Sequence, residues 1–106
     1  ARADGRSKEA EQYFRQALAI KAEQVDALFE MASLYQELGN NLQARAFLER
    51  YMAVAPTSAA SLWLGYRIER GLGDYEQAKR SADRLKRDFA TSPEVTLLLE
   101  AERASQ

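Results

Sequence analysis

Few residue types in this chain of 106 residues can do catalytic chemistry. Histidine and cysteine are both absent, which excludes Ser-His-Asp and Cys-His catalysis, disulfides, and zinc sites built on those ligands. The acidic pairs Glu9–Glu11 and Glu100–Glu102 have members two residues apart, and such residues do not share a helix face. They therefore give no acid–base constellation. Because the sequence also has no glycine-rich phosphate loop, we predict that the chain is not an enzyme and uses no cofactor or metal.

A basic run near the C-terminal end is the second feature that could bind a ligand. It contains Lys79, Arg80, Arg84, Lys86 and Arg87, and such a run could meet phosphates or acidic lipid headgroups. Acidic residues are interleaved with it, and the whole chain has a formal net charge of −1. No overall field therefore attracts the chain to nucleic acid or an anionic membrane. We interpret the run as a solvated outer face and predict no nucleic-acid partner.

Aromatic and arginine side chains share one face of the segment 59–71. At 100° per residue, the core side is expected to hold Ser61, Leu64, Gly65, Ile68 and Leu72. The opposite side is expected to hold Trp63, Tyr66, Arg67 and Arg70. Tryptophan, tyrosine and arginine are typical of a protein-binding hot spot. The alternative is that Trp63 wedges between neighbouring helices while the arginines are simply solvated.

Helices are predicted to position all of these residues. Strong helix formers dominate the composition, and only two prolines and five glycines interrupt them. The expected helices cover residues 7–22, 25–38, 41–54, 59–71, 74–89 and 92–104. No apolar run approaches the roughly 20 residues of a membrane span. The polar start without an initiator methionine indicates a cut made inside a larger protein.

Glycine and alanine recur at one fixed interval along the sequence. Gly5, Gly39 and Gly73 are evenly spaced. The same interval separates Ala10, Ala44 and Ala78. A period of about 34 residues is typical of the tetratricopeptide repeat (TPR), a helix–turn–helix unit with the pattern W-x2-L-G-x2-Y…A-x3-F…P. The chain resembles TPR proteins in this respect.

The central unit fits the TPR pattern along its length. Its first helix carries Leu28-x2-Met31-Ala32-x2-Tyr35, and its second carries Ala44-x3-Leu48, Tyr51 and Pro56. Ala32 and Ala44 are small where paired helices approach closely, while the larger apolar residues fill the grooves between helices. Gly39 can take the left-handed conformation that closes a helix, and Asn40 or Asn41 can cap the next one.

From these features we expect an all-α fold, a TPR helix-turn-helix solenoid that forms a right-handed superhelix of about 2.5 repeats plus a C-terminal capping helix. A single domain would span residues 1–106. Its parts are the second helix of a truncated repeat (7–22), a complete repeat (25–56), an irregular repeat (58–90) and a capping helix with a polar outer face (92–104). In the irregular repeat, Leu64-Gly65-x2-Ile68 is one residue early, and a longer turn around 71–73 would reconcile the register.

In a TPR stack the first helix of each repeat lines a concave surface, so its non-consensus positions are candidates for binding a protein partner. The expected groove residues are Asp26, Phe29, Ser33, Gln36, Leu62, Trp63, Tyr66 and Arg70. The first surviving helix has lost its partner helix. Its apolar face, with Phe14, Ala17 and Leu18, is therefore predicted to mediate self-association.

The irregular repeat resembles a particular family. The segments that carry the resemblance are Ser61-Leu62-Trp63-Leu64-Gly65-Tyr66-Arg67-Ile68, Gly73-Asp74, Leu85-Lys86-Arg87-Asp88-Phe89 and Ser92-Pro93-Glu94. They are similar to the C-terminal end of the type IV pilus biogenesis/stability lipoproteins (PilF/PilW, TPR-containing pilotins). Phe89-Ala90 departs from the aromatic-Pro pair expected at the end of the last repeat.

This resemblance implies a non-catalytic scaffold that assists type IV pilus biogenesis by helping the pilus secretin assemble. It also implies the periplasmic side of the outer membrane, with attachment only through a lipidated cysteine upstream of this fragment. The alternative is a general TPR adaptor or co-chaperone module that binds another protein or peptide in its concave groove. A generic module of that kind would be cytoplasmic.

Overall fold

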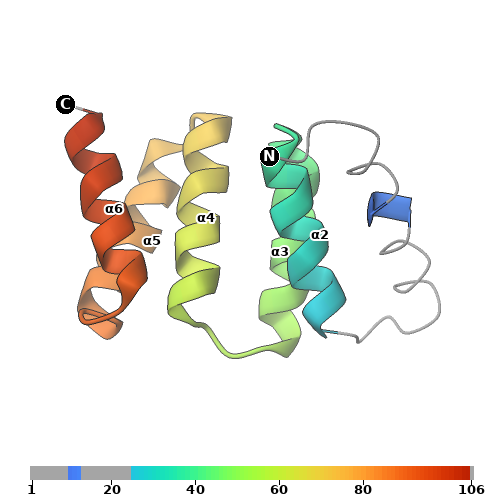
Figure 1. The fold of residues 1–106 in the computed structure, drawn as a ribbon, viewed down its shortest axis with the longest axis horizontal. Coiled ribbons are helices and arrows are strands. Elements are labelled where there is room, and N and C mark those ends of the chain that lie inside the picture. Colours follow the sequence, from blue (N-terminus) through green and yellow to red (C-terminus); the bar gives the residue numbers. More distant parts are fainter. Residues whose placement is uncertain (1–9, 13–24, 106) are drawn as a thin grey trace. The chain divides into compact units, whose positions relative to one another are not determined.

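The computed structural model describes residues 10–12 and 25–105, which form α-helices joined by short turns (Figure 1). The helices are α2 (Val25–Glu37), α3 (Asn41–Val54), α4 (Ala59–Leu72), α5 (Tyr75–Asp88) and α6 (Pro93–Ala104). Each begins and ends within one residue of the bounds expected from the sequence, and the predicted all-α class is confirmed. Of the helix expected over residues 7–22, only 10–12 are described, and they are helical. The predicted self-association surface on that helix lies outside the described residues.

The chain divides into two compact units, Ala1–Pro56 and Thr57–Gln106. The first contains the α2/α3 pair, and the second contains α4, α5 and α6. The expectation of a single domain over the whole chain stays a prediction.

In the first unit, α2 and α3 form a helical hairpin around small and apolar side chains. Ala32 and Ala44 are completely buried, as expected where two helices approach closely. Phe29 meets Tyr51 edge-on with ring centroids 5.1 Å apart, which pairs the start of α2 with the end of α3. Aromatic pairs with this geometry contribute about 0.5–1.5 kcal/mol beyond their buried area.

The turn between α2 and α3 closes with a left-handed glycine. Gly39 has φ 82°, and its N–H donates to the carbonyl of Gln36, while the Asn40 N–H donates to the carbonyl of Tyr35. These two bonds form a Schellman motif. Asn40 occupies the N-cap of α3, but its side chain makes no capping hydrogen bond, so the predicted side-chain cap is wrong at this residue.

The same turn recurs one repeat later, in the second unit. Gly73 has φ 79°, its N–H donates to the carbonyl of Arg70, and the Asp74 N–H donates to the carbonyl of Glu69. Asp74 then caps α5 by accepting a hydrogen bond from the Gln77 N–H at 3.2 Å. From the left-handed glycine to the first residue of the next helix, this turn is as long as its counterpart, so the longer turn predicted around residues 71–73 is wrong.

Burial in α4 follows the strict repeat register, which is the interval between Gly39 and Gly73. Every buried position of α2 has a buried counterpart in α4 at that interval. The pairs are Ala27/Ser61, Leu28/Leu62, Met31/Gly65, Ala32/Tyr66, Leu34/Ile68 and Tyr35/Glu69. Leu64 is buried as well, between the buried pair Leu62 and Gly65. The Leu64-Gly65 pair therefore does not identify the repeat register of α4, because Gly65, and not Leu64, has a buried counterpart in α2.

The second unit packs three helices around one apolar cluster, with α5 behind α4 and α6 in Figure 1. The cluster comprises Leu62, Tyr66, Ala78, Ala82, Leu85 and Leu98. Ser58 begins α4 with a capping box, in which Ser58 and Ser61 each accept a hydrogen bond from the other's backbone N–H. The outer face of α6 is less polar than predicted for a capping helix, because Leu97 and Leu99 are 45% and 44% exposed.

Candidate protein-binding surface

Five side chains of the second unit form a continuous stack, which we call the aromatic–arginine ladder. In order along the stack they are Arg67, Trp63, Tyr66, Arg70 and Tyr75. The Arg67 guanidinium lies 5.2 Å from the Trp63 ring, and the Trp63 and Tyr66 rings stack at 5.7 Å with an interplanar angle of 14°. The Arg70 guanidinium lies 5.9 Å from the Tyr66 ring and 5.3 Å from the Tyr75 ring.

The ladder is buried at its middle, at Tyr66, and exposed at the Arg70–Tyr75 end. Tyr66 is 5% exposed and belongs to the apolar cluster, and Trp63 is half-buried against that cluster. Tyr75 is 62% exposed, and Arg70 is also exposed. The buried rings therefore hold the middle of the stack in place, while the Arg70–Tyr75 end is presented to solvent.

The turn at Gly73 creates the exposed end of the ladder. Arg70 lies in the last turn of α4 and Tyr75 begins α5, so only the left-handed glycine and the Asp74 cap separate the two helices. Each cation–π contact contributes roughly 0.5–1 kcal/mol at an exposed site. Stacking uses the faces of the planar guanidinium and leaves its N–H donors available at the edge.

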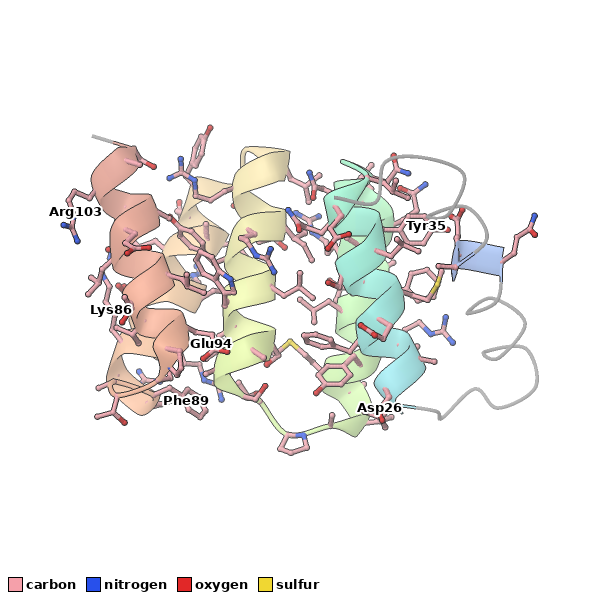
Figure 2. All side chains as sticks on the ribbon, viewed as in Figure 1. Asp26, Tyr35, Lys86, Phe89, Glu94 and Arg103 are labelled. Carbon is pink, nitrogen blue, oxygen red and sulfur yellow. The ribbon has the colours of Figure 1, made fainter. Side chains whose placement is uncertain are left out.

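The predicted groove residues divide into those that reach the surface and those that do not. In the first unit Asp26 is exposed, and Phe29, Ser33 and Gln36 are partly buried (Figure 2 labels Asp26). Their counterparts in the strict repeat register are Ala60, Trp63, Arg67 and Arg70, and all four are at least partly exposed. In the second unit Trp63 is thus partly exposed and Arg70 is exposed, and their place on a partner-binding groove stays a prediction.

Leu62 and Tyr66 were also expected on the groove, and the structure places them in the core instead. They are 4% and 5% exposed and pack with Ala82, Leu85 and Leu98. The assignment failed because it followed the Leu64-Gly65 register. In the strict repeat register Leu62 and Tyr66 correspond to Leu28 and Ala32, which are buried as well.

Two ladder residues were missing from the predicted groove. Arg67 was expected on the aromatic and arginine face of residues 59–71 but was left out of the groove; in the strict repeat register it falls at the position equivalent to Ser33. Tyr75 lies on α5, the second helix of the repeat. The expected groove was assigned only from the first helix of each repeat, so it did not include Tyr75. Its position directly after the Gly73-Asp74 turn was the only sequence signal that it lies beside the end of α4.

The basic side chains of α5 are all paired with neighbouring carboxylates. Lys79 contacts Asp83 at 2.8 Å, Arg84 contacts Asp88 at 3.5 Å, and Lys86, labelled in Figure 2, reaches across to Glu102 of α6 at 2.9 Å. The remaining ion pairs are Arg80–Glu76 and Arg87–Asp88. Hydrogen bonds from Lys79 and Arg87 hold the pKa values of the Asp83 and Asp88 carboxyls below their ordinary value. This pairing supports a solvated outer face rather than a phosphate-binding one.

Over residues 10–12 and 25–105, no group of three or more acidic residues is arranged to hold a metal ion. None of the helices in this described part is long and apolar enough to cross a membrane.

The repeated hairpin and its turn define the class of protein. Residues 1–64 match the family model of the tetratricopeptide repeat, and the chain belongs to the tetratricopeptide-repeat family. Proteins with this architecture are typically scaffolds that bind other proteins on extended surfaces. No curated protein matches the chain.

Two solved structures are similar to the chain. The crystal structure of PilW, described as a widely conserved type IV pilus biogenesis factor, superposes with a TM-score of 0.83 and 27% identity, covering 90% of this chain and 44% of PilW. The structure of pilF from Pseudomonas aeruginosa gives a TM-score of 0.79 and 25% identity, covering 90% of this chain and 43% of pilF. The resemblance predicted from the sequence is thereby confirmed, and the chain spans less than half the length of either protein.

Proposed function

We propose that the chain is part of a non-catalytic scaffold that assists type IV pilus biogenesis by helping the pilus secretin assemble. The observation that carries this proposal is the similarity to PilW and pilF over 90% of the chain. The proposal includes a location on the periplasmic side of the outer membrane, with a lipid anchor upstream of these residues.

The aromatic–arginine ladder is the surface on which we propose that the partner binds. Its residue types are those that dominate the energetics of protein interfaces, and its exposed end is held by buried rings. Such an arrangement lowers the side-chain entropy lost on binding. The α5 face is a weaker candidate, because its cations are already paired.

Secretin assembly in a deletion strain tests the proposal. The full-length protein should co-purify with the secretin from membranes, and its deletion should reduce the secretin multimers at the outer membrane. A strain complemented with the intact gene is the control. Normal secretin multimers in the deletion strain would exclude the assembly role and would favour the general adaptor, whose partner would then be found by cross-linking.

A further inference from the structure

We propose that Arg70 and its two flanking tyrosines dock a carboxylate on an acidic segment of the protein partner. This inference rests on the proposed function as an interaction scaffold, but it does not depend on which protein the partner is. It assigns a chemistry to the exposed end of the ladder, where a solvent-accessible cation lies between two rings.

The geometry prepares the Arg70 guanidinium for a ligand. Tyr66 and Tyr75 approach it at 5.9 Å and 5.3 Å, so rings from two helices restrict a side chain that would otherwise lose rotamer entropy on binding. The guanidinium edge offers parallel N–H donors, which match the two oxygens of a carboxylate. Over residues 10–12 and 25–105, Arg70 has no ion-pair partner.

The two carboxylates at the start of α5 contact other groups. The Asp74 side chain accepts a hydrogen bond from the backbone N–H of Gln77 as the cap of α5. Glu76 forms an ion pair with Arg80. Neither acid pairs with Arg70, whose positive charge complements a negatively charged segment.

A carboxylate fits this site better than a phosphate does. Phosphate recognition draws on clusters of cations and on backbone N–H groups, whereas the exposed end of the ladder offers one guanidinium between two apolar ring faces. Those rings also provide contact area for an apolar side chain next to the acidic one. The expected partner segment thus carries glutamate or aspartate beside an apolar residue.

Trp63 provides the readout, because it is the only tryptophan in the chain and lies in the ladder itself. The full chain is titrated with an acetylated, amidated octapeptide of alternating glutamate and leucine, and with a twin that has glutamine for glutamate. We expect saturable quenching or enhancement with the glutamate peptide at low salt, and at least about tenfold weaker binding of the glutamine twin.

Matched variants localise the binding. Arg70→Gln should weaken binding of the glutamate peptide about tenfold, whereas Arg103→Gln should change it less than twofold. Arg103 is likewise an exposed arginine in the last turn of a helix (labelled in Figure 2), but no aromatic contact to it is found in the described residues. Tyr75→Phe should preserve binding and Tyr75→Ala should weaken it, because only the second variant removes the ring.

Several results would overturn the inference. They are equal binding of the two peptides, equal losses in Arg70→Gln and Arg103→Gln, and displacement of the peptide by inorganic phosphate at the concentration at which acetate displaces it. If the glutamate peptide does not bind but the protein still co-purifies with the secretin, the carboxylate site is contradicted and the proposed scaffold function is not. Loss of secretin co-purification with the titrations unchanged would contradict the proposed function alone.

Discussion

Gly39 and Gly73 occupy the same left-handed conformation, with φ 82° and 79°, at equivalent positions of successive repeats. Each ends the first helix of a repeat with the same pair of backbone hydrogen bonds. The conformation costs an L-amino acid roughly 1–2 kcal/mol. This shared cost explains why glycine marks the period of the sequence.

Replacing either glycine should destabilise its repeat. Gly39→Ala and Gly73→Ala should each lower the free energy of unfolding by about 1–2 kcal/mol. Backbone conformation is the cause, because a Cβ at either position would meet no atom within 4 Å. Urea denaturation followed by circular dichroism measures the change. Gly71→Ala is the control, since Gly71 lies within α4 and alanine there should be neutral or stabilising.

The capping box of α4 gives a second prediction. Ser58→Ala removes the acceptor for the Ser61 N–H and should lower the free energy of unfolding by about 1 kcal/mol. Ser92 occupies the N-cap of α6 but makes no side-chain capping bond, so Ser92→Ala should have a smaller effect. Equal costs for the two variants, measured by thermal unfolding, would contradict the assigned capping roles.

The attachment of α6 to the second unit depends on Leu98. Leu98 is completely buried, whereas its neighbour Leu97 is 45% exposed. Leu98→Ala should therefore cost about 2–5 kcal/mol, and Leu97→Ala should cost no more than about 0.5 kcal/mol. Amide hydrogen exchange would show whether the loss is local, with faster exchange in α6 for Leu98→Ala alone. Similar exchange in both variants would mean that α6 is not packed as described.

The turn and the hairpins were predictable because each depends on local chemistry. Gly39 and Gly73 end their helices through their own backbone conformation. Ala32 and Ala44 are small residues, and small residues at these repeat positions indicate close packing of the two helices.

The groove face of α4 was predicted less well, because the expected groove followed the Leu64-Gly65 register, whereas Tyr66 corresponds to the buried Ala32 in the strict register. The packing of Tyr66 in one cluster with Leu98 of α6 joins residues that are distant in the sequence, and a period along one helix does not reveal it.

The contact between Arg70 and Tyr75 was missed for a related reason. Each residue looks like an ordinary exposed side chain within its own helix. They meet only because the Schellman turn reverses the chain between them. Sequence reasoning therefore found most residues of the proposed binding surface but missed Tyr75.

The ion pairs of α5 predict a pH dependence. The pKa values of Asp83 and Asp88 are lowered in the folded chain, first by hydrogen bonds from Lys79 and Arg87. Because these carboxyls titrate lower when folded, their stabilisation is present above the unfolded pKa of about 3.9. It is lost as the pH falls through the folded values. The acid limb of a stability–pH curve should flatten in the Asp83→Asn, Asp88→Asn double variant.

Salt provides the control for this prediction. The ion pairs are solvent-exposed, so salt screens them. A salt concentration of about 0.5 M should therefore reduce the difference in unfolding free energy between the double variant and the parent chain. A salt-independent difference would show that the substitutions act through packing or helix propensity instead.

Site-specific photo-crosslinking in cells tests the central claim most directly. A photo-reactive phenylalanine derivative is placed at position 63 in the ladder and, as a matched control, at position 80 on the outer face of α5. If the full-length protein is a scaffold for secretin assembly through the ladder, position 63 should crosslink to the secretin and position 80 should not. Crosslinks to the secretin from position 80 alone, or to an unrelated protein from position 63, would contradict it.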